Sequence, residues 1–168
     1  MTGRIPRGNS QADAPLGGLF ALLRNPGEVV RLQRDPALLP SAVEEIPRYE
    51  PPIIFVSRVA LADALLAGVA LRRGELFHLG LASANRDPER YTDPDRFDVG
   101  RADNKHLSFG WGMHICLGAS IARMEARVAF ETLLPRFAKI ELEGPPPPRA
   151  PATAPRTLER FPVRLTSA

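Results

Sequence analysis

The feature that most constrains this chain is the ten-residue segment 109–118, which contains the only cysteine among 168 residues. Three glycines lie in it, and apolar residues at helical spacing predict a long helix directly after Cys116. Backbone N–H groups at a helix start have no helical partner, and the positive end of the helix dipole favours the thiolate that binds metals. Because glycine has no Cβ, the glycines allow tight turns and let a flat group approach the backbone. The segment therefore predicts a loop that presents a metal-binding sulfur in front of a helix.

A single cysteine also has a simpler interpretation, as an inert residue buried in a core. That interpretation leaves unexplained the aromatic residue, the histidine, the glycines and the helix start that surround it. The segment reads Phe-Gly-Trp-Gly-Met-His-Ile-Cys-Leu-Gly, and it resembles the haem-binding signature of the cytochrome P450 monooxygenases at every specified position. The resemblance implies that Cys116 is the axial ligand to the iron of haem b (iron protoporphyrin IX). It also implies that the haem is bound by Phe109, Gly110, Gly112, His114 and Gly118.

An upstream pair carries the same resemblance. Glu45 and Arg48 match a Glu-any-any-Arg pair of the family, and their spacing places both on one face of a helix. In the family this pair is buried with an arginine from a Pro-any-Arg-Phe segment, which implies that Arg96 is the third member. Taken alone, such a pair is more often a solvated salt bridge. Pro47 lies between the two residues, and because proline removes a helical hydrogen bond we expect it to kink the helix or to end it early.

Further site residues follow from the resemblance. Arg58 and His114 match the family's partners of the haem propionates, which is physically reasonable because propionates are anions and arginine offers a bidentate fork. The resemblance assigns a substrate pocket to Ile53, Ile54, Phe55, Val56, Thr157 and Leu158.

Periodicity and turn residues predict the individual elements. They predict helices over 16–24, 27–34, 37–48 and from Cys116 to about Leu134, strands over 53–60 and 160–166, and a hairpin that pairs 69–72 with 75–79. In the last helix, Ile121, Met124, Val128 and Leu133 are predicted to form a buried face. The proline-rich stretch 145–155 is predicted to be a stiff surface loop.

The resemblance extends from residue 16 to the end and implies a mainly α fold with small β-sheets (α+β). We expect residues 1–15 to form a disordered leader and residues 16–168 to form the C-terminal haem-binding part of a cytochrome P450 domain. Because complete family members are much longer, we expect this chain to lack their long central helix, which frames the other face of the haem.

The function that the resemblance implies is that of a haem-thiolate monooxygenase. Such an enzyme inserts one atom of O2 into a small organic substrate with electrons from a ferredoxin-type donor, and we expect it to be incomplete in this chain. One alternative is a non-catalytic haem-binding remnant or accessory protein from a truncated gene. Another is a small α+β interaction domain without a cofactor.

Charge, cysteine content and hydropathy exclude other classes. The 22 basic and 19 acidic residues give a net charge of +3, with the basic residues scattered, so no nucleic-acid partner is predicted. One cysteine allows no intrachain disulfide and fits a reducing compartment. No apolar run approaches the roughly 20 residues that cross a bilayer. We therefore expect a cytoplasmic protein without a membrane anchor.

Overall fold

The computed structural model describes residues 10–145, 158 and 161–167, with side chains described from residue 17 onward. Its helices are α1 (Ser10–Arg24), α2 (Pro26–Arg34), α3 (Leu39–Tyr49), α4 (Leu81–Ala84) and α5 (Ala119–Arg136), with 3-10 turns at Pro36–Leu38 and Gly112–His114. Its strands are β1 (Phe55–Val59), β2 (Ala64–Leu66), β3 (Val69–Leu71), β4 (Leu76–Gly80), β5 (Phe137–Leu142) and β6 (Val163–Ser167). The described strands form three two-stranded antiparallel sheets. This confirms the predicted mainly α fold with small β-sheets.

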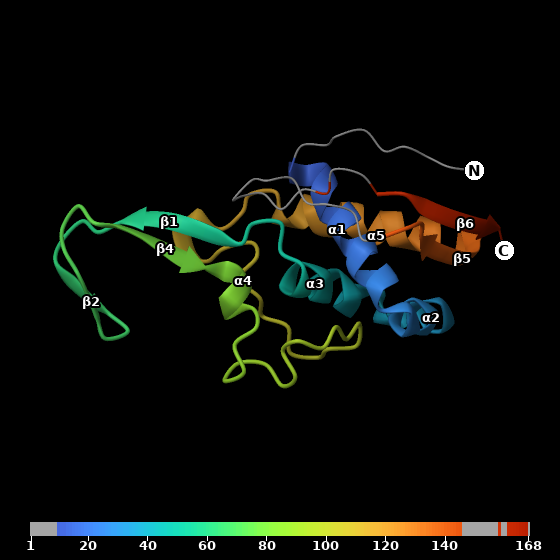
Figure 1. Ribbon diagram of the computed structural model, residues 1–168, viewed down its shortest axis with the longest axis horizontal. Helices are drawn as coiled ribbons and strands as arrows, with labels where there is room; N and C mark the ends of the chain where they lie inside the picture. The colour runs from blue at the N-terminus through green and yellow to red at the C-terminus, as the bar shows by residue number, and fades with distance from the viewer. Residues whose placement is uncertain (1–9, 146–157, 159–160, 168) are drawn as a thin grey trace.

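Four helices, α1, α2, α3 and α5, enclose the hydrophobic core. Figure 1 shows these helices together with β5 and β6 in one half of the molecule, while β1, β4 and β2 extend away from them. Leu22, Ala42 and Val99 are almost completely buried. Because Val99 belongs to the long coil that follows α4, the core extends beyond the helices and fixes that coil against them.

Two predicted boundaries at the N-terminal side change in the structure. Helix α1 begins at Ser10, so residues 10–15 are helical and do not belong to a disordered leader, while residues 1–9 lie outside the described residues. Helix α3 continues through Pro47 to Tyr49, and the N–H of Glu50 still donates to the Ile46 carbonyl at 2.8 Å. The prediction that Pro47 ends the helix early is therefore wrong.

The strand pairing also differs from the predicted hairpin. Strand β3 pairs with β2, with Ala67 and Gly68 at positive φ in the turn between them, whereas β4 pairs with β1. The turn at Arg73-Gly74 exists, with Gly74 at φ +84°, but it connects strands of two different sheets. Because β1 and β4 pair, the segment that follows β4 lies beside the start of β1.

The predicted buried face of the last helix is wrong at three of its four positions. Ile121, Met124 and Val128 are about half exposed in α5. Ala119, Phe130 and Leu134 are buried instead, because α5 packs on α1 and α3 with the face that carries these residues. Leu133 is partly buried against the core, as predicted.

Two predictions concern the C-terminal part of the chain, the final strand and the proline-rich stretch. The final strand, predicted over 160–166, is β6 at Val163–Ser167 and pairs with β5. Except for Pro145, the proline-rich stretch lies outside the described residues. Among the helices that are described, none combines the length and the apolar character needed to cross a bilayer.

Candidate functional site

The segment 109–118 folds into a closed loop directly ahead of α5. The Cys116 N–H donates to the Phe109 carbonyl at 2.8 Å, which joins the two ends of the loop, and the Gly110 N–H donates to the Leu107 carbonyl at 2.8 Å. Gly110 and Gly112 have φ values of +73° and +68°, a region that residues with a Cβ adopt only at a cost. At Gly110 a Cβ would also lie 3.2 Å from the His114 carbonyl oxygen. The glycines are therefore needed to close the loop around the cysteine.

The Cys116 thiol is exposed at the entrance to α5. The Ala119 N–H donates to the Cys116 carbonyl at 3.2 Å, and Gly118 is the N-cap of the helix. A Cβ on Gly118 would lie 3.9 Å from the sulfur, an ordinary contact distance. The interpretation of Cys116 as an inert core residue is therefore wrong, because its sulfur is accessible to a ligand.

The sulfur opens onto a groove with a cavity volume of about 480 Å³. The groove brings together segments that are far apart in the sequence: the loop, the strand β1 and the turn after β4. Of the residues predicted for the site, it is lined by Ile53, Val56, Arg58, Phe109, Gly110, His114 and Cys116. A sulfur ligand, a guanidinium group and an imidazole thus share one mainly apolar groove.

Other predicted residues lie outside the groove lining. Strand alternation in β1 turns Val56 and Arg58 toward the groove, whereas Phe55 packs on the His78 ring with centroids 4.9 Å apart. Ile54, Gly112, Gly118 and Leu158 are also absent from the lining, and Thr157 lies outside the described residues. The groove lining does not test the assignment of Ile54, Phe55 and Leu158 to a substrate pocket, so that assignment stays a prediction.

Several lining residues were missed by the sequence analysis, among them Leu79, Leu81 and Leu107. Leu79 and Leu81 were missed because the hairpin prediction paired the segment 75–79 with 69–72. Pairing of β4 with β1 brings Leu79 and Leu81 beside Val56. Alternating apolar residues in β4 were the available signal, but they do not identify the partner strand.

Arg58 is free to bind an anion. Its side chain is exposed and donates to the Ser57 carbonyl at 2.8 Å. Within the part of the chain that the structure describes, Arg58 forms no ion pair with a carboxylate. Since His114 lines the same groove, the two side chains provide hydrogen-bond donors for acidic groups of a ligand that fills it.

A buried ion pair supports this arrangement from the side of α3. The Arg48 Nε and Nη2 atoms lie 2.6 and 2.8 Å from the two carboxylate oxygens of Glu45, and both side chains have no exposed surface. Arg48 also donates to the carbonyl groups of Asn85, Pro94 and Arg96. The predicted pairing of Glu45 with Arg48 is thus present, and it ties α3 to the coil after α4.

The third arginine of this network differs from the predicted one. The Arg101 Nε atom lies 3.2 Å from a Glu45 carboxylate oxygen, whereas the Arg96 side chain is exposed. Arg96 joins only through its carbonyl group, which accepts hydrogen bonds from Arg48 and Arg101. Both arginines lie in the same segment, and no local pattern distinguishes them. A turn with Asp93 at φ +47° precedes both arginines.

Asn85 connects the network to the loop. It is completely buried, its side-chain oxygen accepts from the Leu107 N–H at 2.8 Å, and its Nδ2 atom donates to the Ser108 hydroxyl at 2.7 Å. The Ser108 hydroxyl in turn donates to the Pro47 carbonyl at 2.6 Å. The residues just before Phe109 are therefore fixed to both α3 and the turn after β4.

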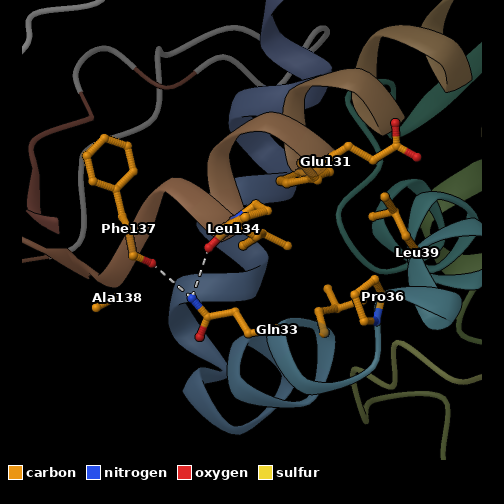
Figure 2. A pocket seen from close by; sticks show the side chains of 10 residues that line it. Gln33, Pro36, Leu39, Glu131, Leu134, Phe137 and Ala138 are labelled. Carbon is orange, nitrogen blue, oxygen red and sulfur yellow. Dashed lines mark hydrogen bonds between the residues drawn. The ribbon is translucent and has the colours of Figure 1, made fainter. Parts of the chain in front are cut away.

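A second groove, of about 440 Å³, lies between α2 and the C-terminal end of α5. Figure 2 shows Gln33 donating from its side-chain nitrogen to the carbonyl groups of Leu134 and Phe137, at 3.2 and 3.1 Å. These bonds satisfy carbonyls at the end of α5 that have no helical partner. None of the residues predicted for the site lines this groove, so it is separate from the cysteine loop.

Comparison with known proteins adds independent findings. A family model described as Cytochrome P450 matches residues 33–158. Cytochrome P450-terp of a Pseudomonas species is 44% identical over 130 residues, covering 77% of this chain and 30% of that protein. The biotin biosynthesis cytochrome P450 of Bacillus subtilis is 44% identical over 145 residues, covering 86% of this chain and 37% of that protein.

A solved structure agrees with these matches. The cytochrome P450 PksS of the Bacillus subtilis bacillaene polyketide synthase superposes with a TM-score of 0.90 at 36% identity, covering 95% of this chain and 42% of that chain. The chain thus spans about a third of the length of the curated relatives that it matches.

Proposed function

The chain belongs to the cytochrome P450 family, and we propose that it forms the thiolate side of a haem-dependent monooxygenase, with Cys116 as the ligand to the haem iron. The observation that carries the proposal is the groove that joins the exposed Cys116 sulfur with Arg58 and His114. The fold, the loop and the groove each support this proposal, and different parts of the sequence form them.

The groove suits a flat, dianionic cofactor such as haem b. Gly110 lines the groove and has no side chain, so a planar group can approach the backbone at this position. Arg58 and His114 would hold the two propionates, because both side chains donate hydrogen bonds and Arg58 carries a positive charge. The start of α5 would favour the thiolate form of Cys116, since the first N–H groups of a helix lack helical partners.

When bound, the haem would supply the activation of O2, with the thiolate donating electron density to the iron. In the overall reaction one oxygen atom enters the substrate and the other leaves as water, with two electrons and two protons consumed. The chain's own contribution is to provide the sulfur, to orient the cofactor through Arg58 and His114, and to exclude water with the apolar wall of the groove.

The substrate that fits this wall is a small apolar organic molecule. Ile53, Val56, Leu79 and Leu81 line the groove, and none of them offers a hydrogen bond or a charge from its side chain. Electrons would come from a ferredoxin-type partner, as the family relationship implies. These assignments concern a complete enzyme of the family. This chain spans about a third of the length of the curated relatives that it matches.

Absorption spectroscopy tests the proposed ligation. The chain is loaded with ferric haem, reduced, and exposed to carbon monoxide. We expect a Soret band at the long wavelength typical of a thiolate ligand, because sulfur donates strongly to the iron. Cys116→Ser should lose this band, whereas Ser120→Ala, a change at an exposed position in the first turn of α5, should retain it. A fully loaded chain that lacks the band, or a Cys116→Ser variant that keeps it, would contradict the proposal.

Monooxygenation itself needs a separate measurement. The haem-loaded chain, joined to the preceding part of one of its curated relatives, is supplied with a ferredoxin, its reductase and an apolar substrate under labelled O2. We expect one labelled oxygen atom in the product for each substrate that is consumed. Product oxygen that comes from water instead would exclude this reaction.

A further inference from the structure

Behind the cysteine loop lies a second charged cluster that the sequence analysis did not identify. It consists of Glu44 from α3, His106 from the coil and Arg123 from α5. The Arg123 Nε and Nη2 atoms lie 2.6 and 2.9 Å from the two Glu44 carboxylate oxygens, and the His106 Nε2 atom lies 3.2 Å from one of them. His106 is almost completely buried. The cluster therefore joins three segments of the chain at one carboxylate.

The direction of the histidine bond follows from its second partner. The Ser108 N–H donates to the His106 Nδ1 atom at 3.2 Å, so Nδ1 is an acceptor and Nε2 carries the proton that it donates to Glu44. Burial would raise the pKa of Glu44, but hydrogen bonds from His106 and Arg123 outweigh burial and lower it to about 2. Glu44 is thus an anion with two fixed donors.

Phe109 connects this cluster to the sulfur ligand. The Arg123 guanidinium carbon lies 4.5 Å from the centre of the Phe109 ring, and the His106 ring lies 5.5 Å from it at a tilt of 49°. The Phe109 carbonyl accepts the hydrogen bond from the Cys116 N–H. A series of contacts therefore runs from Glu44 through Arg123 and Phe109 to Cys116.

Arg123 is a cation that Glu44 and the Phe109 ring hold beside the loop. The pKa of Arg123 is raised, mainly by its hydrogen bond to Glu44 and to a smaller degree by the charge of Cys116. Arg127, one turn further along α5, pairs with Glu131 at 2.7 Å on the exposed side of the helix and has no contact with Phe109 in the described residues. The chain thus offers two paired arginines on one helix, of which one is coupled to the loop.

We propose that Arg123, held by Glu44 and His106, is a positioning residue for the Cys116 thiolate: it fixes Phe109 under the loop, and its charge, balanced by Glu44, sets the electron donation from the sulfur to the iron. This inference rests on the proposed function, because it requires that Cys116 binds haem iron. A positive charge near the thiolate favours the ferrous state, which carries one more electron than the ferric state.

The reduction potential of the haem-loaded chain distinguishes this role from simple structural support. Arg123→Gln leaves the Glu44 charge unbalanced, so the ratio of ferrous to ferric chain at a fixed potential should fall several-fold. Glu44→Gln leaves the Arg123 charge unbalanced, so this ratio should rise several-fold. A tenfold change corresponds to about 59 mV for a one-electron couple. If the cluster only stabilised the fold, both substitutions would loosen the loop and shift the potential in the same direction.

A readout without haem tests the positioning of the loop. Trp111 is the only tryptophan of the chain and lies in the loop, so its fluorescence reports on this segment alone. In the haem-free chain, Arg123→Gln should lower the anisotropy of this emission because Phe109 is released. Arg123→Lys keeps the positive charge, so its reduction potential should stay near that of the parent chain. Its Trp111 anisotropy should fall in part, because lysine lacks the planar fork of arginine.

Arg127→Gln is the matched control, since it removes the same charge from the same helix away from Phe109. It should change neither the potential nor the anisotropy. Opposite shifts for Arg123→Gln and Glu44→Gln, with no shift for Arg127→Gln, would support the inference. Shifts of one sign, or an equal effect of Arg127→Gln, would overturn it while leaving the ligation intact. Absence of the long-wavelength band in the unsubstituted chain would overturn both the ligation and this inference.

Discussion

At the scale of single residues, the buried carboxylate of Glu45 organises a polar network between α3 and the coil after α4. It accepts hydrogen bonds from the side chains of Arg48, Arg101 and Asn104, and from the Asp98 N–H. A buried carboxylate without such partners would be strongly destabilising. The network therefore holds the coil after α4 against α3, and with it the residues that lead into the cysteine loop.

The two arginines of this coil should differ in their contribution to stability. Arg101→Met removes charge-assisted hydrogen bonds to Glu45 and should lower the free energy of unfolding by about 2–3 kcal/mol. Arg96→Met removes only an exposed side chain and should change it by less than about 0.5 kcal/mol. Urea unfolding of both variants measures the difference. Equal losses would contradict the assignment of Arg101 as the third member.

Glu44 should make the stability of the chain depend on pH in the acid range. Its pKa falls from 4.5 to about 2 on folding, because hydrogen bonds from His106 and Arg123 outweigh the effect of burial. A lowered carboxyl pKa contributes stability that is complete above about pH 4.5 and is lost as pH falls toward 2. With allowance for its partial exposure, the contribution is roughly 1–2 kcal/mol.

Comparison with Glu44→Gln isolates this effect from that of Asp98, whose pKa is also lowered. Burial raises the Asp98 pKa, but hydrogen bonds from the Gly100 N–H and from Arg31 outweigh burial, so the pKa is lowered overall. Thermal unfolding between pH 5 and pH 2 should therefore show a steeper loss for the parent chain than for the variant. Parallel curves would show that Glu44 is not stabilised by its partners.

At the scale of elements, the loop and the helix behind it have different requirements. Helix α5 tolerates exposed apolar residues such as Met124, because only the face with Phe130 and Leu134 packs on α1 and α3. The loop has little such packing, and its shape depends on backbone hydrogen bonds, which the N–H groups of Gly110, Ile115 and Cys116 donate, and on glycines with positive φ. Its geometry should therefore be more sensitive to backbone substitutions than to changes at its exposed side chains.

Two glycines of the loop provide a matched test. Alanine at a positive φ costs about 1–2 kcal/mol through backbone strain at either position. Gly110→Ala should cost more than Gly112→Ala, because its Cβ would lie 3.2 Å from the His114 carbonyl, whereas nothing lies within 4 Å at Gly112. Denaturant unfolding and Trp111 anisotropy measure both effects. A larger loss for Gly112→Ala would contradict this account of the loop.

At the scale of the whole molecule, the groove exists only because three distant segments meet. Residues of β1, the turn after β4 and the loop line it together, and Asn85 holds the second and third of these segments in place. Around the sulfur, Trp111, Met113 and Leu117 remain at least four-fifths exposed. An apolar surface of this kind next to a ligand groove is typical of a binding site.

A ligand that binds only the folded chain should stabilise it by mass action. At a free haem concentration of one hundred times Kd, the free energy of unfolding should rise by about 2.7 kcal/mol. For a chain of this size, that corresponds to an increase in Tm of roughly 5–10 °C. Differential scanning fluorimetry measures it, with Cys116→Ser at the same haem concentration as the control. An equal increase for this variant would show that stabilisation does not depend on the sulfur.

The sequence by itself determined the parts of the site that are local. The loop motif, the position of Cys116 ahead of a helix and the pairing of Glu45 with Arg48 all depend on residues within ten positions of one another. At such separations, backbone geometry fixes which side chains meet, so the residue pattern is sufficient. Even Pro47 did not disturb the pair, because α3 continues through it.

Only the tertiary structure decided the long-range contacts. Arg101 meets Glu45 across 56 positions, Arg123 meets Glu44 across 79, and β4 pairs with β1 in place of its predicted neighbour. For each of these contacts the sequence offers more than one candidate arginine or strand, and local periodicity does not distinguish among the candidates. Packing of the whole core selects the partner, because burying one arginine beside a carboxylate excludes the other from the same space.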